Sequence, residues 1–284
     1  IILHGLQSNS HSSLCIDMAN AFLETGLSTV ACINFRGCSG TPNDTMGGYH
    51  LGFTDDILLF LEHHRQQTRA TNSVSEPVYL SGFSLGANVM VKALGELQER
   101  AVEEYNIRGA AAYCLTLDAE RNAPYLGRPG INRMVYTNNL LRSLKQVCQH
   151  KMDRFGQAEE MRFDYHRAMA SETITDFDDA FVAPVYGFDG AIDYYRKTSS
   201  VYFLDRVAVP TLILNARDDP FLDPTFFPTE LSRENGGKAP IKMVRTEHGG
   251  HLGFVFHQVT ETEKQQLTVS WGPREMARFI QHCQ

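Results

Sequence analysis

Residues 82–86 read Gly82-Phe83-Ser84-Leu85-Gly86, which is the pattern G-x-S-x-G. An apolar run over 77–80 precedes this pattern, and a stretch that favours helix over 87–94 follows it. A strand, a tight turn and a helix in this order are what a nucleophile elbow requires. The two glycines let the backbone double back without a Cβ clash, so the serine hydroxyl is exposed beside the amides that begin the helix. Ser84 is therefore a candidate nucleophile.

The sequence on both sides of this turn alternates between strand and helix patterns. We expect strands over 1–4, 28–34, 77–82 and 109–117, and helices over 12–25, 53–67 and 85–99. The run 29–33 is nearly all apolar, which is typical of a strand buried on both faces. Alternation of this kind predicts an α/β fold with a mostly parallel, doubly wound sheet.

The alternation breaks after residue 118. Residues 119–185 contain helix-prone stretches, such as 138–152, and no convincing strand. It then resumes with a helix over 191–197, strands over 210–214 and 241–244, and a helix over 273–282. We expect one catalytic domain whose core comprises 1–118 and 186–284, with 119–185 as a helical cap insertion. An ordinary extra helical layer would give the same pattern.

Composition narrows the possible classes of protein. With 284 residues, 43% of them hydrophobic, the chain can bury one large core. Its net charge of −7, without a basic cluster, argues against a nucleic-acid partner. No window approaches 18 uninterrupted apolar residues, so we expect no transmembrane helix in this sequence.

The cysteines and the N-terminal residues of the sequence give information on the cellular compartment of the protein. Six cysteines are scattered without C-x-x-C pairs, which disfavours a zinc site or a disulfide framework and favours a reducing compartment such as the cytoplasm. The sequence begins inside a strand-like run, Ile1-Ile2-Leu3-His4-Gly5, without a methionine. We therefore expect an N-terminal truncation, and a targeting signal or membrane anchor upstream would lie outside this sequence.

A serine nucleophile needs a base, and the base needs a carboxylate to orient it. In α/β-hydrolases these groups follow in the order Ser, Asp or Glu, His, each at the carboxyl end of a strand. The loop after the strand over 210–214 offers Asp218, Asp219 and Asp223, and the loop after 241–244 offers His248 and His251. The order fits, although spacing alone leaves the choice within each loop open.

Two backbone amides must bind the oxyanion that forms during attack. One is the N–H of Leu85, directly after the nucleophile, and the other is the N–H of Leu6, in the turn after the first strand. His4 is better placed for packing or for shaping this turn than for acting as a base. The mechanism requires no metal and no cofactor.

Together these motifs resemble the YheT-like, abhydrolase domain-containing family of the α/β-hydrolase superfamily. The resemblance covers nearly the whole chain and rests on His4-Gly5-Leu6, 34–43, Tyr49-His50-Leu51-Gly52, 82–88, Phe177-Asp178-Asp179, Asp218-Asp219-Pro220-Phe221 and 249–254. It implies Ser84 as nucleophile, Asp219 as carboxylate and His251 as base. It also implies hydrolysis of short to medium acyl esters or acylglycerols.

The chain departs from the family pattern at two places. Ala87 stands where the family usually has glycine. The oxyanion loop usually reads Gly-Ser after His-Gly-Leu-x, whereas here Gln7 is followed by Ser8. The second departure makes the Leu6 donor less defined. In the shared segment 34–43, we expect Arg36 to pair with a carboxylate such as Asp55 or Asp56.

The sequence therefore predicts a serine ester hydrolase that works through an acyl-enzyme. An acyltransferase with the same triad, or a non-catalytic binding protein with this fold, are the alternatives. The expected partner is a small ester or lipid, with peripheral membrane contact as an option. The apolar residues expected to line an acyl pocket are Tyr125, Leu126, Ile131, Met134, Val135, Leu140, Leu141 and Leu144.

Overall fold

Six parallel strands form the central sheet in the computed structural model, which describes residues 1–71, 76–156, 162–259 and 266–284. The spatial order is β2-β1-β3-β4-β5-β6. The chain therefore winds outward from β1 to one edge, and then from β3 to the other edge. This is the doubly wound arrangement expected from the sequence. The strands are β1 (Ile2–Leu3), β2 (Cys32–Ile33), β3 (Val78–Phe83), β4 (Ile107–Tyr113), β5 (Thr211–Ala216) and β6 (Ile241–Thr246).

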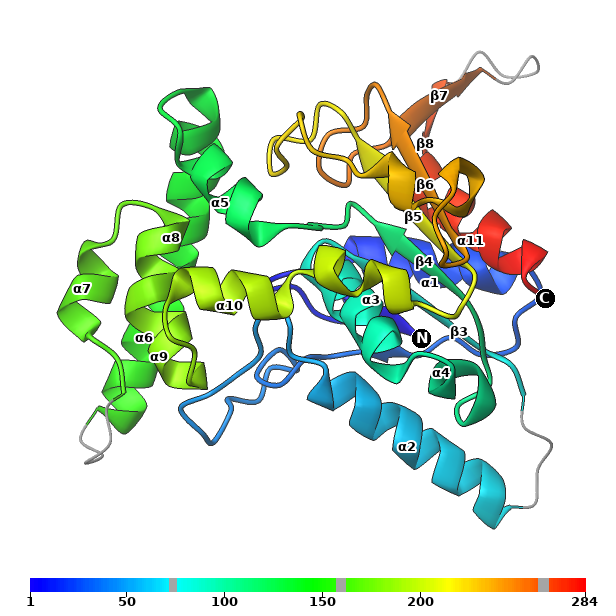
Figure 1. Cartoon of the computed structure of the whole chain (residues 1–284), viewed down its shortest axis with the longest axis horizontal. Helices are drawn as coiled ribbons and strands as arrows, with labels where there is room; N and C mark the ends of the chain where they lie inside the picture. Colours follow the sequence, from blue (N-terminus) through cyan, green and yellow to red (C-terminus); the bar gives the residue numbers. More distant parts are fainter. Residues whose placement is uncertain (72–75, 157–161, 260–265) are drawn as a thin grey trace.

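Helices cover both faces of this sheet (Figure 1). On one face, Leu212 and Leu214 of β5 belong to a hydrophobic cluster with α1 (Ser13–Glu24) and α11 (Trp271–His282). On the other face, Ile213 belongs to a cluster with α2 (Asp55–Ala70) and α3 (Leu85–Leu97). Because successive side chains point to opposite faces, both sets must be apolar, which explains the apolar runs in the sequence.

Three features differ from the sequence expectations. β2 comprises only Cys32–Ile33, and within the described residues it pairs with β1 alone. Cys32 and Ile33 are both half-buried, so the expectation of a strand buried on both faces is wrong for this edge strand. β4 ends at Tyr113 because the backbone turns at Cys114 and Leu117, which have φ of 50° and 44°. An antiparallel hairpin, β7 (Val255–Val259) with β8 (Gln266–Ser270), was not expected.

A layer of helices lies between β4 and β5 in the sequence and to one side of the sheet (Figure 1). This helical layer has its own hydrophobic cluster, to which Leu141, Cys148, Phe177 and Tyr194 contribute. We propose that residues 119–185 are a cap insertion and that α10 completes its core. The layer comprises α5 (Ala119–Gly127), η1 (Arg133–Thr137), α6 (Asn138–Phe155), α7 (Tyr165–Ala170), α8 (Ile174–Phe177), η2 (Asp178–Val182), α9 (Ala183–Tyr186) and α10 (Ala191–Thr198).

The remaining helical segments are short: α4 (Arg100–Glu103), η3 (Ser200–Arg206), η4 (Thr229–Leu231) and η5 (Arg233–Asn235). Among the described residues, none of the helices combines the length and the hydropathy that crossing a bilayer requires.

One carboxyl group is buried in the core of the helical layer. Asp178 accepts a hydrogen bond from the hydroxyl of Tyr195 at 2.6 Å, and burial raises the pKa of this aspartate to about 7. In the unfolded chain an aspartate ionises at about pH 4. Between these two values the folded state holds a proton that the unfolded state has released, so stability falls as the pH rises.

We expect Asp178→Asn to raise the melting temperature at pH 8 and to change it much less at pH 4. In the parent chain, the free energy of unfolding falls by up to about 1.4 kcal/mol for each pH unit between the unfolded and the folded pKa of Asp178. Asparagine does not titrate, so the substitution abolishes this fall. Asp179→Asn is the matched control, because hydrogen bonds from the Ala191 N–H and from Arg167 lower the pKa of Asp179. Thermal unfolding across pH is the measurement. Identical pH profiles for Asp178→Asn and the parent chain would contradict the assignment.

Candidate active site

Ser84 lies at the turn between β3 and α3, with φ of 54° and ψ of −123°. This conformation is costly for a residue with a side chain and persists only where the surroundings enforce it. Two close approaches do so here. A Cβ on Gly86 would lie 2.3 Å from the His4 carbonyl oxygen, and a Cβ on Gly82 would lie 2.7 Å from the Gly86 carbonyl oxygen. Gly86 is therefore required by the packing of the turn against β1, and Gly82 by its close approach to the start of α3.

Ser84, His251 and Asp219 form a continuous hydrogen-bonded chain. The Ser84 Oγ lies 3.0 Å from His251 Nε2, and His251 Nδ1 lies 2.8 Å from Asp219 Oδ2. The Asp219 side chain is fully buried, and its other oxygen accepts the Phe221 N–H at 2.9 Å. Because an ionised carboxylate only accepts, Nδ1 carries the proton and Nε2 accepts from the serine hydroxyl. This arrangement can take a proton from Ser84.

The same two loops form a second Asp–His pair. His248 Nδ1 lies 3.3 Å from Asp218 Oδ2, and the two side chains are 90% and 45% exposed. Partial burial opposes ionisation of Asp218, but hydrogen bonds from the Gly250 N–H and from His248 outweigh it and lower its pKa. This pair makes no hydrogen bond to Ser84 within the described chain.

The third acidic candidate is used elsewhere. Asp223 accepts hydrogen bonds from the N–H and the hydroxyl of Thr225, while its own N–H donates to Asn122. Of the five candidates that the sequence offered, the structure brings only Asp219 and His251 together with Ser84.

Two backbone donors in the segments that meet at Ser84 have no hydrogen-bond partner in the described part of the chain. Neither the N–H of Leu85 nor that of Leu6 donates to another group in the described part of the chain. The N–H of Gln7, next along the loop, donates to the Tyr49 hydroxyl at 2.6 Å. The loop conformation at the Gln7-Ser8 departure is therefore held by a side chain from a distant segment.

His4 has a packing role. It is fully buried, its Nδ1–H donates to the Gly5 carbonyl at 2.7 Å, and its Nε2 accepts the Phe35 N–H at 3.2 Å. Burial lowers its pKa, which keeps the ring neutral. Phe35 in turn stacks on Tyr49, with ring centroids 4.9 Å apart. His4 thus supports the Tyr49 contact to the oxyanion loop.

Two motif residues hold the loop over 34–53 in place, Arg36 against α2 and His50 against the helical layer. The Arg36 guanidinium pairs with Asp56 at 2.5 Å, one of the two expected partners, and lies over the Phe53 ring. His50 packs among Phe53, Tyr186, Phe188 and Tyr194, and burial lowers its pKa to about 3. The His50 ring is therefore a neutral part of an aromatic cluster.

Two residues beside the histidine were not anticipated. The backbone N–H of Leu252 donates to the Cys114 Sγ at 3.3 Å, and the thiol contacts the Gly250 carbonyl, so Cys114 holds the loop on both sides of His251. Burial and the neighbouring Asp219 raise the pKa of Cys114, which keeps it an uncharged thiol. The Phe221 ring lies 4.4 Å from the His251 ring. A strand over 109–117 would include Cys114, whereas β4 ends at Tyr113 and Cys114 follows the carboxyl end of the strand.

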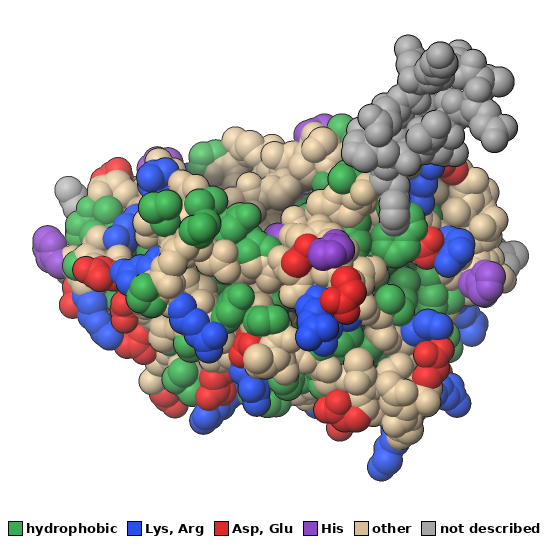
Figure 2. Space-filling view, turned by 90° about the horizontal axis from the view of Figure 1, so that it is seen from above, with side chains coloured by type: hydrophobic (Ala, Val, Ile, Leu, Met, Phe, Trp, Pro, Cys, Tyr) green, Lys and Arg blue, Asp and Glu red, His purple; other side chains and the backbone are tan. Residues whose placement is uncertain are grey.

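A cavity of about 680 Å³ opens beside the oxyanion loop, under α6. Its apolar lining includes Leu6, Cys38, Tyr49, Leu144, Phe181 and Tyr186. Of the eight residues expected to line an acyl pocket, only Leu144 does so. Leu126 and Leu141 are buried, and Leu141 belongs to the core of the helical layer, whereas Ile131, Met134 and Val135 are 73%, 67% and 41% exposed. Figure 2 looks onto the face that carries this layer and shows it hollowed beside hydrophobic side chains.

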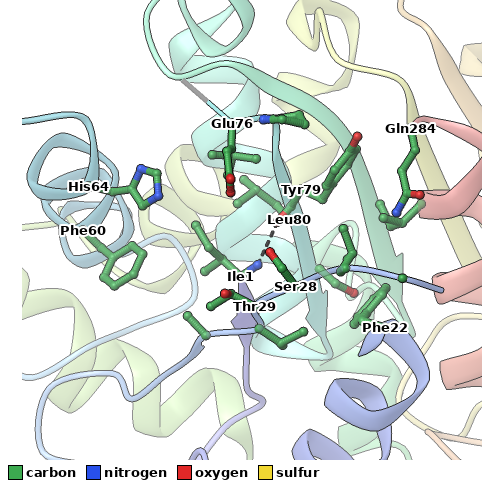
Figure 3. A pocket seen from close by; sticks show the side chains of 18 residues that line it. Ile1, Phe22, Ser28, Thr29, Phe60, His64, Glu76, Tyr79, Leu80 and Gln284 are labelled. Carbon is green, nitrogen blue, oxygen red and sulfur yellow. Dashed lines mark hydrogen bonds between the residues drawn. The ribbon is translucent and has the colours of Figure 1, made fainter. Parts of the chain in front are cut away.

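A second cavity, of about 450 Å³, lies around Ile1 (Figure 3). The Ile1 amino group donates to the Tyr79 carbonyl at 2.8 Å, and the lining includes Phe22, Phe60 and Glu76. Tyr79 is near the start of β3, whereas Ser84 follows its end. The lining of this cavity along β3 runs from Val78 to Ser81 and does not include Ser84.

One group of side chains among the described residues has metal-ligating atoms within 4.8 Å of one another: Cys114, Asp219 and His251. Both ring nitrogens of His251 are already engaged by Asp219 and Ser84. The geometry is therefore that of a proton-transfer chain, and we assign no metal to it.

Comparison with known proteins agrees with this geometry. The profile of the alpha/beta hydrolase fold matches residues 1–258. YheT of Escherichia coli K12, described as a candidate esterase, is 30% identical over 90% of this chain and 70% of its own length. Medium-chain fatty acid ethyl ester synthase/esterase 2 of Saccharomyces cerevisiae is 27% identical over 99% of this chain, which spans 61% of that protein.

A solved structure supports the fold. A candidate hydrolase from Legionella pneumophila superposes with a TM-score of 0.60 at 11% identity, covering 99% of this chain and 78% of the other. The profile match, the identity with YheT and the superposition agree with the sheet order and the elbow. The chain therefore belongs to the alpha/beta hydrolase fold family, in the branch that includes YheT.

Proposed function

We propose that this protein is a serine carboxylic ester hydrolase that acts on short to medium acyl esters or acylglycerols. The observation that carries the proposal is the position of His251, which is hydrogen-bonded to Ser84 through one nitrogen and to the buried Asp219 through the other. The free N–H groups of Leu6 and Leu85 and the adjacent cavity support it. The names of the two relatives point to esters as the substrate class.

In the proposed reaction, the Ser84 Oγ attacks the ester carbonyl carbon while His251 Nε2 takes its proton. Negative charge moves to the carbonyl oxygen, where the Leu6 and Leu85 N–H groups would bind it. The tetrahedral species collapses, the carbon–oxygen bond to the alcohol breaks, and His251 returns the proton to the leaving alcohol. A water molecule, deprotonated by the same histidine, then releases the acid from Ser84. Asp219 holds the ring and stabilises its charge throughout.

Labelling with a fluorophosphonate, followed by a panel of esters, tests this proposal. The reagent modifies an activated serine irrespective of the natural substrate, so it separates an enzyme from a binding protein with the same fold. We expect labelling of Ser84 and turnover of at least one ester. A chain that binds esters but neither reacts nor turns over would be a non-catalytic binding protein.

Acyl transfer is the second candidate, because the yeast relative is named both a synthase and an esterase. An alcohol would replace water in the second half of the same reaction. Product analysis with added ethanol distinguishes the two, since transfer gives an ethyl ester and hydrolysis gives the free acid.

We expect kcat/KM to rise with acyl length over the first few carbons, by about fourfold per methylene that enters the cavity beside Leu144, and then to level off. Leu144→Trp should fill part of this space and flatten the profile. Leu140→Trp is the matched control, because Leu140 is one turn earlier on α6 and does not line the cavity. Kinetics on an ester series are the measurement. A flat profile in the parent chain would contradict the acyl assignment.

A further inference from the structure

Three large apolar side chains project from the start of η1 into solvent. Ile131, Met134 and Val135 are 73%, 67% and 41% exposed. Their spacing, i, i+3 and i+4, places them on one side of the helical turn. They belong neither to the core of the helical layer nor to the cavity lining. We call these three residues the apolar ridge.

The ridge lies in a segment that carries charge of one sign. Residues 121–152 contain six Arg and Lys side chains and no Asp or Glu, in a chain whose net charge is −7. Arg121 and Arg133 pair with Asp118 and Glu172. Arg128 and Arg142, on the two sides of the ridge in sequence, are exposed and belong to none of the salt bridges of the described residues. Their contacts are with uncharged groups: Arg128 lies over the Tyr125 ring, and Arg142 donates to the Asn139 side chain. The six basic residues are several positions apart in the sequence, so they do not form a basic cluster there.

The ridge is also close to the candidate active site. Tyr136, next to Val135, packs its ring 5.3 Å from that of Phe221, and Phe221 lies 4.4 Å from the His251 ring. Figure 2 shows hydrophobic and basic side chains side by side over the helical layer on this face. The residue that follows the ridge is therefore linked to the His251 ring through two ring contacts.

We propose that the apolar ridge and the two arginines dock the protein onto an anionic lipid surface. The three side chains would enter the boundary between head groups and acyl chains, and Arg128 and Arg142 would face the anionic head groups. Exposed apolar side chains beside two exposed arginines that form no salt bridge among the described residues match the two interactions that an anionic lipid surface offers, which are burial of apolar area and attraction of cations. Docking is separate from catalysis, although its benefit, direct access of lipid esters to Ser84, rests on the proposed function.

The test is co-sedimentation of the 284-residue chain with phosphatidylcholine vesicles that contain or lack phosphatidylserine. We expect binding to the anionic vesicles that weakens with salt. Arg128→Gln with Arg142→Gln should reduce the partition coefficient by roughly fivefold for each arginine. Ile131→Ser with Met134→Ser should also reduce it at least fivefold. The matched controls are Leu59→Ser, a 70% exposed leucine on α2, and Arg108→Gln, an exposed arginine at the start of β4.

Vesicle binding is measured without turnover, so its result does not depend on whether the protein is a hydrolase. Ser84→Ala protein should bind vesicles as the parent does, and the ridge variants should hydrolyse a water-soluble ester at the parent rate. Failure of the parent chain to bind anionic vesicles, equal binding to neutral vesicles, or equal losses in the control variants would overturn the proposal. So would a dimer in solution that Ile131→Ser with Met134→Ser dissociates, because the ridge would then be a protein interface.

Discussion

Replacing Ser84 by alanine should abolish fluorophosphonate labelling and reduce ester turnover by about a millionfold. The change removes only the Oγ, whose described hydrogen bond is with His251 Nε2. Alanine keeps the Cβ, so the backbone at φ of 54° is no more strained than before. The free energy of unfolding should therefore change little. Labelling and steady-state kinetics on purified, folded protein are the measurements.

Ser81→Ala provides the matched control. Ser81 is three residues earlier on β3, and its buried hydroxyl donates to the Ala111 carbonyl at 2.9 Å. Its loss should lower stability by about 1 kcal/mol and leave labelling intact. Residual activity above a few per cent in folded Ser84→Ala protein would remove the serine from the mechanism.

The two Asp–His pairs should differ sharply when each is broken. His251→Gln should lower turnover by about a millionfold and Asp219→Asn by about ten-thousandfold, since the first removes the base and the second its orientation. His248→Gln and Asp218→Asn should each change turnover by less than about tenfold. Both members of the second pair are far more exposed, and neither bonds to Ser84.

The four variants are matched in chemistry and share the same two loops, so general loop damage would affect both pairs. Kinetics together with circular dichroism of each variant decide the assignment. The proposed triad would be wrong if, with all four proteins folded, His248→Gln lowered turnover more than His251→Gln, or Asp218→Asn more than Asp219→Asn.

The parts of the fold that the sequence predicted well depend on local patterns. The elbow needs Gly82, Ser84 and Gly86 at fixed spacing between a strand and a helix, and all of this information lies within a short stretch. The order of strands and helices also follows from short-range periodicity. The family resemblance added which aspartate and which histidine to expect, and these two belong to the hydrogen-bonded chain that ends at Ser84. Their roles in catalysis are part of the proposed function.

What the sequence could not predict depends on contacts between distant segments. Ile131 and Met134 are as apolar as Leu144, yet of the three only Leu144 lines the cavity, because that depends on how α6 lies over the loops beside the sheet. The end of β4 was misplaced because Cys114 and Leu117 are apolar like the strand before them. The hairpin of β7 and β8 consists of two short strands whose pairing is not visible from either alone.

Gln7 joins two parts of the molecule. Its side chain hydrogen-bonds Ser143 on α6, which covers the cavity, and its backbone follows directly after Leu6, whose N–H is the proposed oxyanion donor. An acyl group too bulky for the cavity would push α6 outward, and Gln7 would tend to move with it. Such a substrate would still be held by the cavity, but the amide beside its carbonyl would be misplaced. Discrimination between acyl groups would then appear in kcat more than in KM, as selection during the reaction and not on binding.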